Sequence, residues 1–170
     1  MRGERPDGMD SGNVGTAEDI KAAFRISDLQ GFRNSTGQYY AVVGHNRSSR
    51  LITDKWIGAV DDEDAFKTVL EFICRHFETG NYSYWLADLR HMSSSFAHSE
   101  DWLADVVFPR TIAAGLEREA VVLPARENVP PDFDVFGSAT SALRKITDGR
   151  VRGFQDLDMA KEWLFGVRSS

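Results

Sequence analysis

The segment from Trp85 to Phe96, WLADLRHMSSSF, gathers residues whose types suit chemistry. An apolar run ends in Asp88, Arg90 and His91, and three serines follow directly. Such a set suits a histidine-assisted serine nucleophile, a phosphorylated switch serine, or a surface that recognises a partner or an anionic ligand. The alternative is a polar turn between a strand and a helix, and the spacing alone does not separate these possibilities.

An enzyme would need Asp88, His91 and His98 to meet one of the serines 93–95 at the carboxyl end of a strand, where α/β sheets tend to place ligands. The chain has no G-x-S-x-G elbow, no P-loop and no dinucleotide-binding glycine pattern. His91 and His98 also lack an established metal-ligand spacing. We therefore predict no catalytic residue, no metal and no cofactor, and we keep a hydrolase as the second alternative function.

A recognition site is the better hypothesis for this segment. Asp88 and Arg90 form an ion pair or hold backbone amides in one interpretation, and contact a ligand in the other. Arg90 and Arg110 would clamp a carboxylate or phosphate if both faced one cleft. The candidate residues for binding a ligand or partner are Asp88, Arg90, His91, Ser95, His98, Ser99 and Arg110.

Hydrophobic periodicity predicts the elements that position this segment. Runs rich in β-branched and aromatic residues predict strands, and the turn residues at 46–49 join the first two strands as an antiparallel hairpin. Phe66, Leu70, Ile73 and Phe77 recur at helical spacing and predict one buried stripe. The expected strands are 38–45, 50–58, 82–90, 117–124 and 149–154, and the expected helices are 61–80, 99–116, 136–146 and 156–166.

Several local features refine the helices. Ser99 is the expected N-cap of the second helix, and Pro109 should kink or break that helix because it cannot donate a backbone hydrogen bond. Along the third expected helix, one buried face should be shared by Phe136, Ala139, Leu143 and Ile146. The last helix should begin at the capping residue Asp156 and end at a glycine.

The resulting order is β-β-α-β-α-β-α-β-α, a single α/β domain over residues 38–166 with a mixed, mostly parallel sheet packed by helices. Residues 1–37 are expected to form a flexible tail with a short helix at 16–24 capped by Thr16, and residues 167–170 a C-terminal tail. The segment GFRNSTGQ, residues 31–38, is expected to be a loop.

Composition limits the function classes. A chain of 170 residues, 42% apolar and 27% charged, has the size and composition of one soluble domain. No apolar run approaches the roughly 20 residues that span a bilayer, so we expect no membrane span. A net charge of −6 argues against nucleic acid as a partner. The single cysteine, Cys74, is expected to be buried and inert, and it favours a reducing cytoplasm.

The order of elements resembles the STAS fold of sulfate transporters and anti-sigma factor antagonists. More closely, the chain resembles a group of small bacterial proteins with a SpoIIAA-like or STAS/SEC14-like domain. The resemblance rests on WIG after residue 55, YWLADLRHM at 84–92, EDWLADVVFPRTIAAGLEREAVVLP at 100–124 and FQDLDMAKEWL at 154–164. It implies the fold, and it implies no activity.

Partner-switching members of the STAS family carry a phosphorylated serine near the start of the second helix. Here Asp88 stands for their strand-end aspartate, but the loop lacks the expected order of Asp-Ser-Ser-Gly, and Ser99 precedes two acidic residues. We therefore expect Ser99 to act as a cap rather than as a switch.

The four tryptophans suggest a further hypothesis. They would line a pocket for a lipid-like ligand or, as we expect, pack in the core; they are Trp56, Trp85, Trp102 and Trp163.

The sequence thus predicts a non-catalytic regulatory or interaction module whose recognition surface surrounds the loop from Arg90 to Ser99. Its expected partner is another protein or a second copy of the chain in a homodimer. The first alternative is a small amphipathic or anionic ligand bound in a cleft near Asp88, Arg90 and His91.

Overall fold

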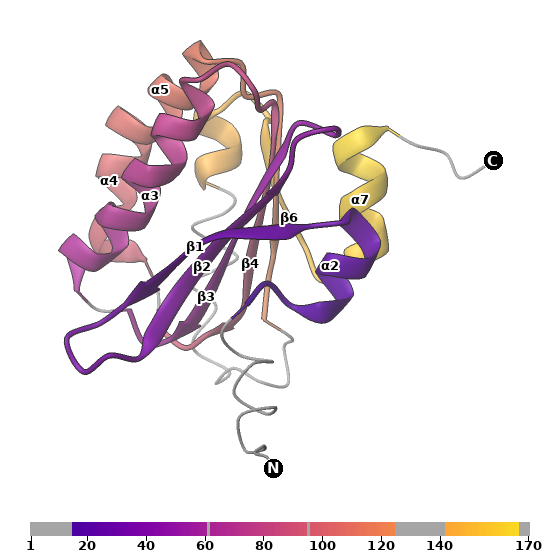
Figure 1. Ribbon diagram of the computed structural model, residues 1–170. Coiled ribbons are helices and arrows are strands. Elements are labelled where there is room, and N and C mark those ends of the chain that lie inside the picture. Colours follow the sequence, from indigo (N-terminus) through magenta and orange to yellow (C-terminus); the bar gives the residue numbers. More distant parts are fainter. Residues whose placement is uncertain (1–14, 61, 95, 125–141, 167–170) are drawn as a thin grey trace.

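A six-stranded mixed sheet forms the centre of the molecule, with helices on both of its faces (Figure 1). The computed structural model describes residues 15–60, 62–94, 96–124 and 142–166. The strands are β1 (Ser27–Arg33), β2 (Tyr39–Asn46), β3 (Leu51–Gly58), β4 (Tyr84–Met92), β5 (Arg118–Val122) and β6 (Val151–Phe154).

The strands lie in the sheet in their sequence order, β1-β2-β3-β4-β5-β6. The pairs β1–β2 and β2–β3 are antiparallel, because short turns join them, and the pairs β3–β4, β4–β5 and β5–β6 are parallel. The predicted α/β class and the opening hairpin are confirmed. In this arrangement the carboxyl ends of β3, β4 and β5 lie at the same end of the sheet.

Strand β1 differs from the prediction, which placed residues 1–37 in a tail and residues 31–38 in a loop. β1 pairs with β2 along an edge of the sheet, so part of that segment belongs to the fold. The strand was missed because its apolar residues are few and its register with β2 shifts twice. Gly31 also weakens the pattern, and its missing side chain leaves room for the Tyr39 ring, which would lie 2.5 Å from a Cβ at this position.

Helices cover the sheet in two groups (Figure 1). Helices α3, α4 and α5 lie over one face, and α2 and α7 lie over the other. Residues 142–146 are also helical. The bounds are α2 (Glu18–Phe24), α3 (Glu63–Phe77), α4 (Glu100–Trp102), α5 (Phe108–Ala113) and α7 (Leu157–Phe165).

Each face of the sheet carries its own apolar core. On the α3 side, the predicted stripe of Phe66, Leu70, Ile73 and Phe77 is buried as expected. On the α2 side, Ile20 and Phe24 pack against residues of β3, β4 and β5. Helix α2 therefore closes a core rather than lying in a tail.

Two details of the C-terminal region separate correct from wrong expectations. Leu143 is buried in the core on the α3 side, but Ile146 is 56% exposed, so the prediction that both residues face inward is wrong for Ile146. The carboxylate of Asp156 accepts hydrogen bonds from the N–H groups of Asp158 and Met159, which confirms the predicted cap of α7. Phe136 and Ala139 lie outside the described residues.

The second predicted helix changes its hydrogen-bond pattern next to Pro109 but continues through it. It consists of α4, a π-helical turn at Leu103–Val107 and then α5, with Pro109 in the first turn of α5. The wider π turn accommodates the missing backbone donor of proline, which explains why the change falls there. Among the described residues, every helix is too short or too polar to cross a membrane.

Candidate functional site

The carboxyl end of β4 holds Asp88 and Arg90 in one hydrogen-bonded cluster. Asp88 is 1% exposed and accepts hydrogen bonds from both Nε of Arg90, at 2.9 Å, and the Arg90 backbone N–H, at 3.2 Å. Asp88 therefore forms an ion pair with Arg90 and also binds a backbone amide, as the structural interpretation predicts. The other side of the guanidinium donates to Asp19 at the start of α2, at 2.8 and 3.1 Å. The two carboxylates neutralise Arg90 and raise its pKa.

Further polar contacts fix the segment before α2 to the same end of the sheet. Nζ of Lys55 donates to the carbonyl oxygen of Gly15, at 3.1 Å. Thr16 donates through both its backbone N–H and its hydroxyl to Asp28, and these bonds lower the pKa of Asp28 against the effect of burial. Thr16 thus does not cap α2, whose N-cap position is Ala17. The cluster of charges around Asp88 holds the first helix in place.

Polar side chains are exposed at the end of β4 and directly after it. His91 and Ser93 are exposed, and the N–H of Ser93 donates to the carbonyl oxygen of Gly58 at 2.9 Å. Ser94 is half-buried, and its hydroxyl accepts a hydrogen bond from the N–H of Val60 at 2.7 Å. Ser95 lies outside the described residues.

His98 and Ser99 form a local pair. Nε2 of His98 donates to the carbonyl oxygen of Val60 at 3.2 Å, so in the neutral ring Nδ1 accepts from the Ser99 hydroxyl, 2.7 Å away. Ser99 occupies the N-cap position of α4, as predicted, but its side chain caps no helix N–H group. Because Ser99 is only 1% exposed, a kinase cannot reach its hydroxyl, whereas Ser93 is accessible.

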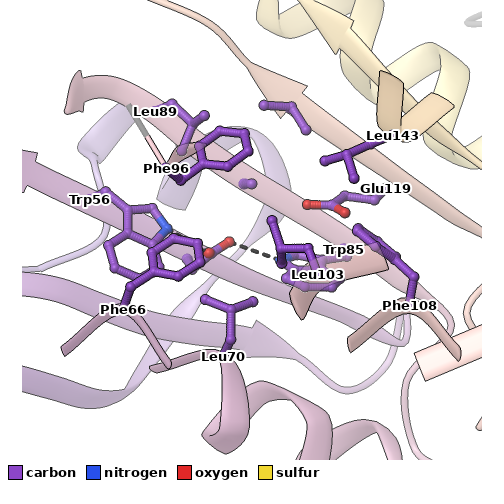
Figure 2. Close-up of a pocket in the computed structure, with 13 residues that line it drawn as sticks. Trp56, Phe66, Leu70, Trp85, Leu89, Phe96, Leu103, Phe108, Glu119 and Leu143 are labelled. Carbon is purple, nitrogen blue, oxygen red and sulfur yellow. Dashed lines mark hydrogen bonds between the residues drawn. The ribbon is translucent and has the colours of Figure 1, made fainter. Parts of the chain in front are cut away.

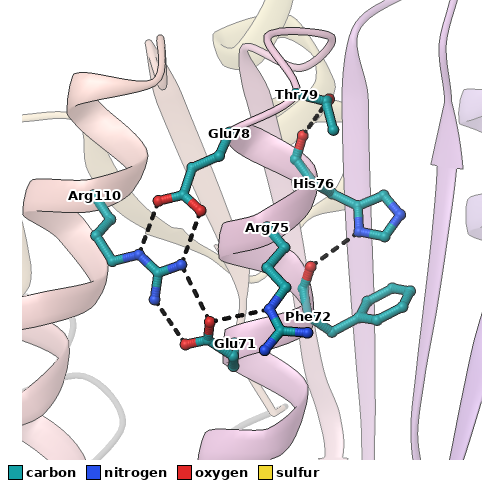
Figure 3. Close-up of polar contacts among 7 residues, drawn as sticks. All are labelled: Glu71, Phe72, Arg75, His76, Glu78, Thr79 and Arg110. Atoms are coloured by element: carbon teal, nitrogen blue, oxygen red, sulfur yellow. Dashed lines mark hydrogen bonds and ion pairs between the residues drawn. The ribbon is translucent and has the colours of Figure 1, made fainter.

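Arg110 lies on the opposite face of the sheet from Arg90, so the two guanidiniums do not form a clamp. Figure 3 shows Arg110 reaching from α5 to two carboxylates of α3. It donates to Glu71 at 2.7 and 3.2 Å and to Glu78 at 2.9 and 3.0 Å. These bonds lower the pKa of both glutamates. Arg110 therefore joins two helices that cover the same face.

The geometry for serine hydrolysis is incomplete among the described residues. The bonds of the His98 ring go to Ser99 and to a backbone carbonyl, and no carboxylate orients this ring. The buried Ser99 hydroxyl also cannot meet a substrate from solvent. No group of three His, Cys, Asp or Glu residues suited to a metal ion occurs in the described ranges. Cys74 is buried, and burial raises its thiol pKa to about 11.

A second site lies between the sheet and α3 (Figure 2). Of the four tryptophans considered for a pocket, Trp56 and Trp85 line it, but its two acids, Asp54 and Glu119, were not predicted. It is a pocket of about 40 Å³ with walls of aromatic and aliphatic side chains. Asp54 of β3 is 3% exposed there and accepts hydrogen bonds from the indole N–H groups of Trp56, at 2.7 Å, and Trp85, at 2.9 Å. Burial raises the pKa of Asp54 to about 6 against the effect of these bonds.

Glu119 of β5 points into the same pocket (Figure 2). Its side chain is buried, and its Oε1 has no hydrogen-bond partner in the described part of the chain. Burial, together with repulsion from Asp54, raises the pKa of Glu119 well above its usual range. Asp54 and Glu119 are each an acidic residue inside a strand that is otherwise predicted to be buried. This pattern is the sequence signal that could have identified the site.

No protein-family model and no curated protein matches the chain. Among solved structures, the chain is similar to the anti-sigma factor antagonist SpoIIAA in its unphosphorylated form. The two share 15% identity, the match covers 70% of this chain and 93% of that chain, and the TM-score is 0.46. At this TM-score the likeness does not assign the chain to a family.

Proposed function

We propose that this chain is a regulatory interaction module of STAS type that binds a protein partner through the turn after β4. The observation that supports this proposal is the exposure of His91 at the end of β4, Ser93 just after it and His98 before α4, three residues that we call the loop surface. The carboxyl ends of parallel strands are the usual place for recognition in α/β sheets.

Hydrogen bonds hold the described residues of the loop surface against the segment after β3. The N–H of Ser93 donates to the carbonyl oxygen of Gly58, the hydroxyl of Ser94 accepts from the N–H of Val60, and the ring of His98 donates to the carbonyl oxygen of Val60. Residues that are already held in place lose less conformational entropy on association, which favours binding.

The charge around the loop surface indicates the kind of partner. Glu100 and Asp101, in the first turn of α4, lie directly after His98 and Ser99, and Asp101 is exposed. An acidic surface with two imidazoles complements a basic patch on another protein. Arg90, which the anionic-ligand alternative required, is already neutralised by Asp19 and Asp88, so that alternative loses its support.

The test compares two double variants of the tagged protein in pull-downs from its source cells. His91→Ala with Ser93→Ala changes the loop surface. Arg47→Ala with Ser48→Ala changes an equally exposed turn at the other end of β3 and serves as the control. We expect a protein that co-purifies with the wild type and the control to fall by about tenfold, or 1.4 kcal/mol, with the loop variant.

Equal recovery with both double variants, or equal loss with both, would overturn the proposal. Native mass spectrometry of the purified protein adds the subunit number. It tests the proposed homodimer separately, because self-association and partner binding then appear as different masses.

A further inference from the structure

The pocket between the sheet and α3 contains two acids and no base. Thirteen described residues line it, and apart from Asp54 and Glu119 all of them are apolar or aromatic. Strands β3, β4 and β5 form its floor, and residues of α3, α5 and the helical turns between α4 and α5 form its roof. The acids project from the sheet into this space.

The two acids differ in the hydrogen bonds that their carboxylates accept. Both oxygens of Asp54 accept an indole N–H, whereas Oε1 of Glu119 has no hydrogen-bond donor among the described residues. A buried acceptor without a donor costs about 1–3 kcal/mol, and an uncompensated buried charge costs more. A group that brings N–H donors and a positive charge would remove both penalties.

The aromatic walls suit a cation as well. Trp56 stacks on Phe66 with ring centroids 4.9 Å apart, and Phe66 lies parallel to Phe96 at 6.1 Å. Trp85 and Phe108 lie 5.9 Å apart on another part of the lining. Aromatic faces attract ammonium groups, most strongly where water is excluded.

We propose that this pocket binds the ammonium end of a small primary alkylamine, with Glu119 accepting its N–H groups and the aromatic rings contacting its carbon atoms. The volume of about 40 Å³ sets the size of the bound group. A cavity of roughly 10–15 Å³ holds one water molecule. A volume of about 40 Å³ therefore has room for about three non-hydrogen atoms, which is the size of an ammonium group with one or two carbons. This site is separate from the loop surface, and its test is independent of the proposed function.

The experiment uses the ¹⁵N-labelled full chain and ethylamine at neutral pH, with ethanol as the neutral probe of similar size. The four tryptophan indole N–H signals report the position of binding by NMR. Trp56 and Trp85 donate to Asp54 in the pocket, while Trp102 and Trp163 lie outside its lining and act as internal controls.

We expect ethylamine to shift the signals of Trp56 and Trp85 in a saturable manner and to leave those of Trp102 and Trp163 unchanged. Ethanol should produce no saturable shift. Glu119→Gln keeps the shape of the side chain but removes the charge, and it should weaken ethylamine binding by about tenfold or more, or 1.4 kcal/mol. Glu117→Gln, on an exposed residue just before β5, should bind ethylamine like the wild type.

Equal shifts with ethanol would show a cavity that accepts any small molecule or water, and would overturn the proposal. An absence of shifts with ethylamine, or full binding by Glu119→Gln, would overturn it as well. The comparison of ethylamine with ethanol uses the wild-type chain, so it does not depend on how the variant folds.

Discussion

Arg90 at the end of β4 donates two hydrogen bonds to Asp19 at the start of α2, although 71 positions separate the two residues in the chain. The same guanidinium also bonds to Asp88, which is buried beneath it. Arg90 thus connects the first helix to the middle of the sheet. A residue that the sequence suggests for ligand binding has a structural role.

Arg90→Ala should destabilise the protein by about 2–3 kcal/mol, because it removes the guanidinium that pairs with the buried carboxylate of Asp88 at 2.9 Å. His91→Ala should change stability by less than about 0.5 kcal/mol, since that side chain is exposed. Urea unfolding at neutral pH measures both. Similar losses for the two variants would contradict the distinction between a structural arginine and a free surface histidine.

Phe24→Ala should cost about 3–4 kcal/mol, because Phe24 is 4% exposed and packs in the core on the α2 side. The neighbouring change Gln30→Ala, at an exposed position of β1, should cost less than about 0.5 kcal/mol. Thermal and urea unfolding provide the measurement. If Phe24→Ala unfolds like the wild type, helix α2 does not contribute to the stability of the domain.

Glu119→Gln should stabilise the protein increasingly as the pH rises. The raised pKa of Glu119 means that the folded state binds its proton more tightly than the unfolded chain does. Its contribution to stability is therefore complete below the unfolded pKa of about 4.3 and is lost as the pH rises through the folded pKa. The variant avoids this loss, so its advantage should grow from near zero at about pH 4 to about 1–3 kcal/mol at about pH 8.

Urea unfolding of both proteins across this pH range measures the difference. Asp54, whose pKa burial raises to about 6, repels Glu119, so the measured difference also includes the loss of this repulsion in the variant. A stability advantage of Glu119→Gln that is constant with pH would mean that the Glu119 carboxyl titrates alike in the folded and unfolded states.

Cys74 should not react in the folded protein. Its thiol is fully buried, and the rise of its pKa to about 11 removes nearly all thiolate at neutral pH. Labelling with a chromogenic disulfide should be at least about 100-fold slower than in denaturing guanidinium chloride. Rapid labelling of the folded chain would show that this part of α3 opens readily.

Helix α3 illustrates how far the sequence predicts the fold. Its apolar spacing predicted the buried stripe, and the predicted range 61–80 contains the observed helix, Glu63–Phe77. Strand β1 was not predicted because an edge strand with one exposed face needs few apolar residues. Its partner strand, rather than its own composition, determines its conformation.

The candidate site was predicted only in part, for a related reason. Asp88 and Arg90 are close in sequence, so their pairing could be anticipated, but Asp19 lies in a segment that was assigned to a tail. Asp54 and Glu119 lie on strands that are not adjacent in the sheet, and the pocket between them exists only because helices cover that face. Such a relationship depends on tertiary packing, which local patterns do not encode.

The order of the strands has a consequence for how the chain is made. A ribosome delivers the N-terminal end first, and here each described strand pairs with the one synthesised just before it. No later strand has to insert between two that are already paired. The sheet can therefore grow during translation by addition at one edge, without reopening earlier pairs, which limits the time that unpaired strand edges are open to aggregation.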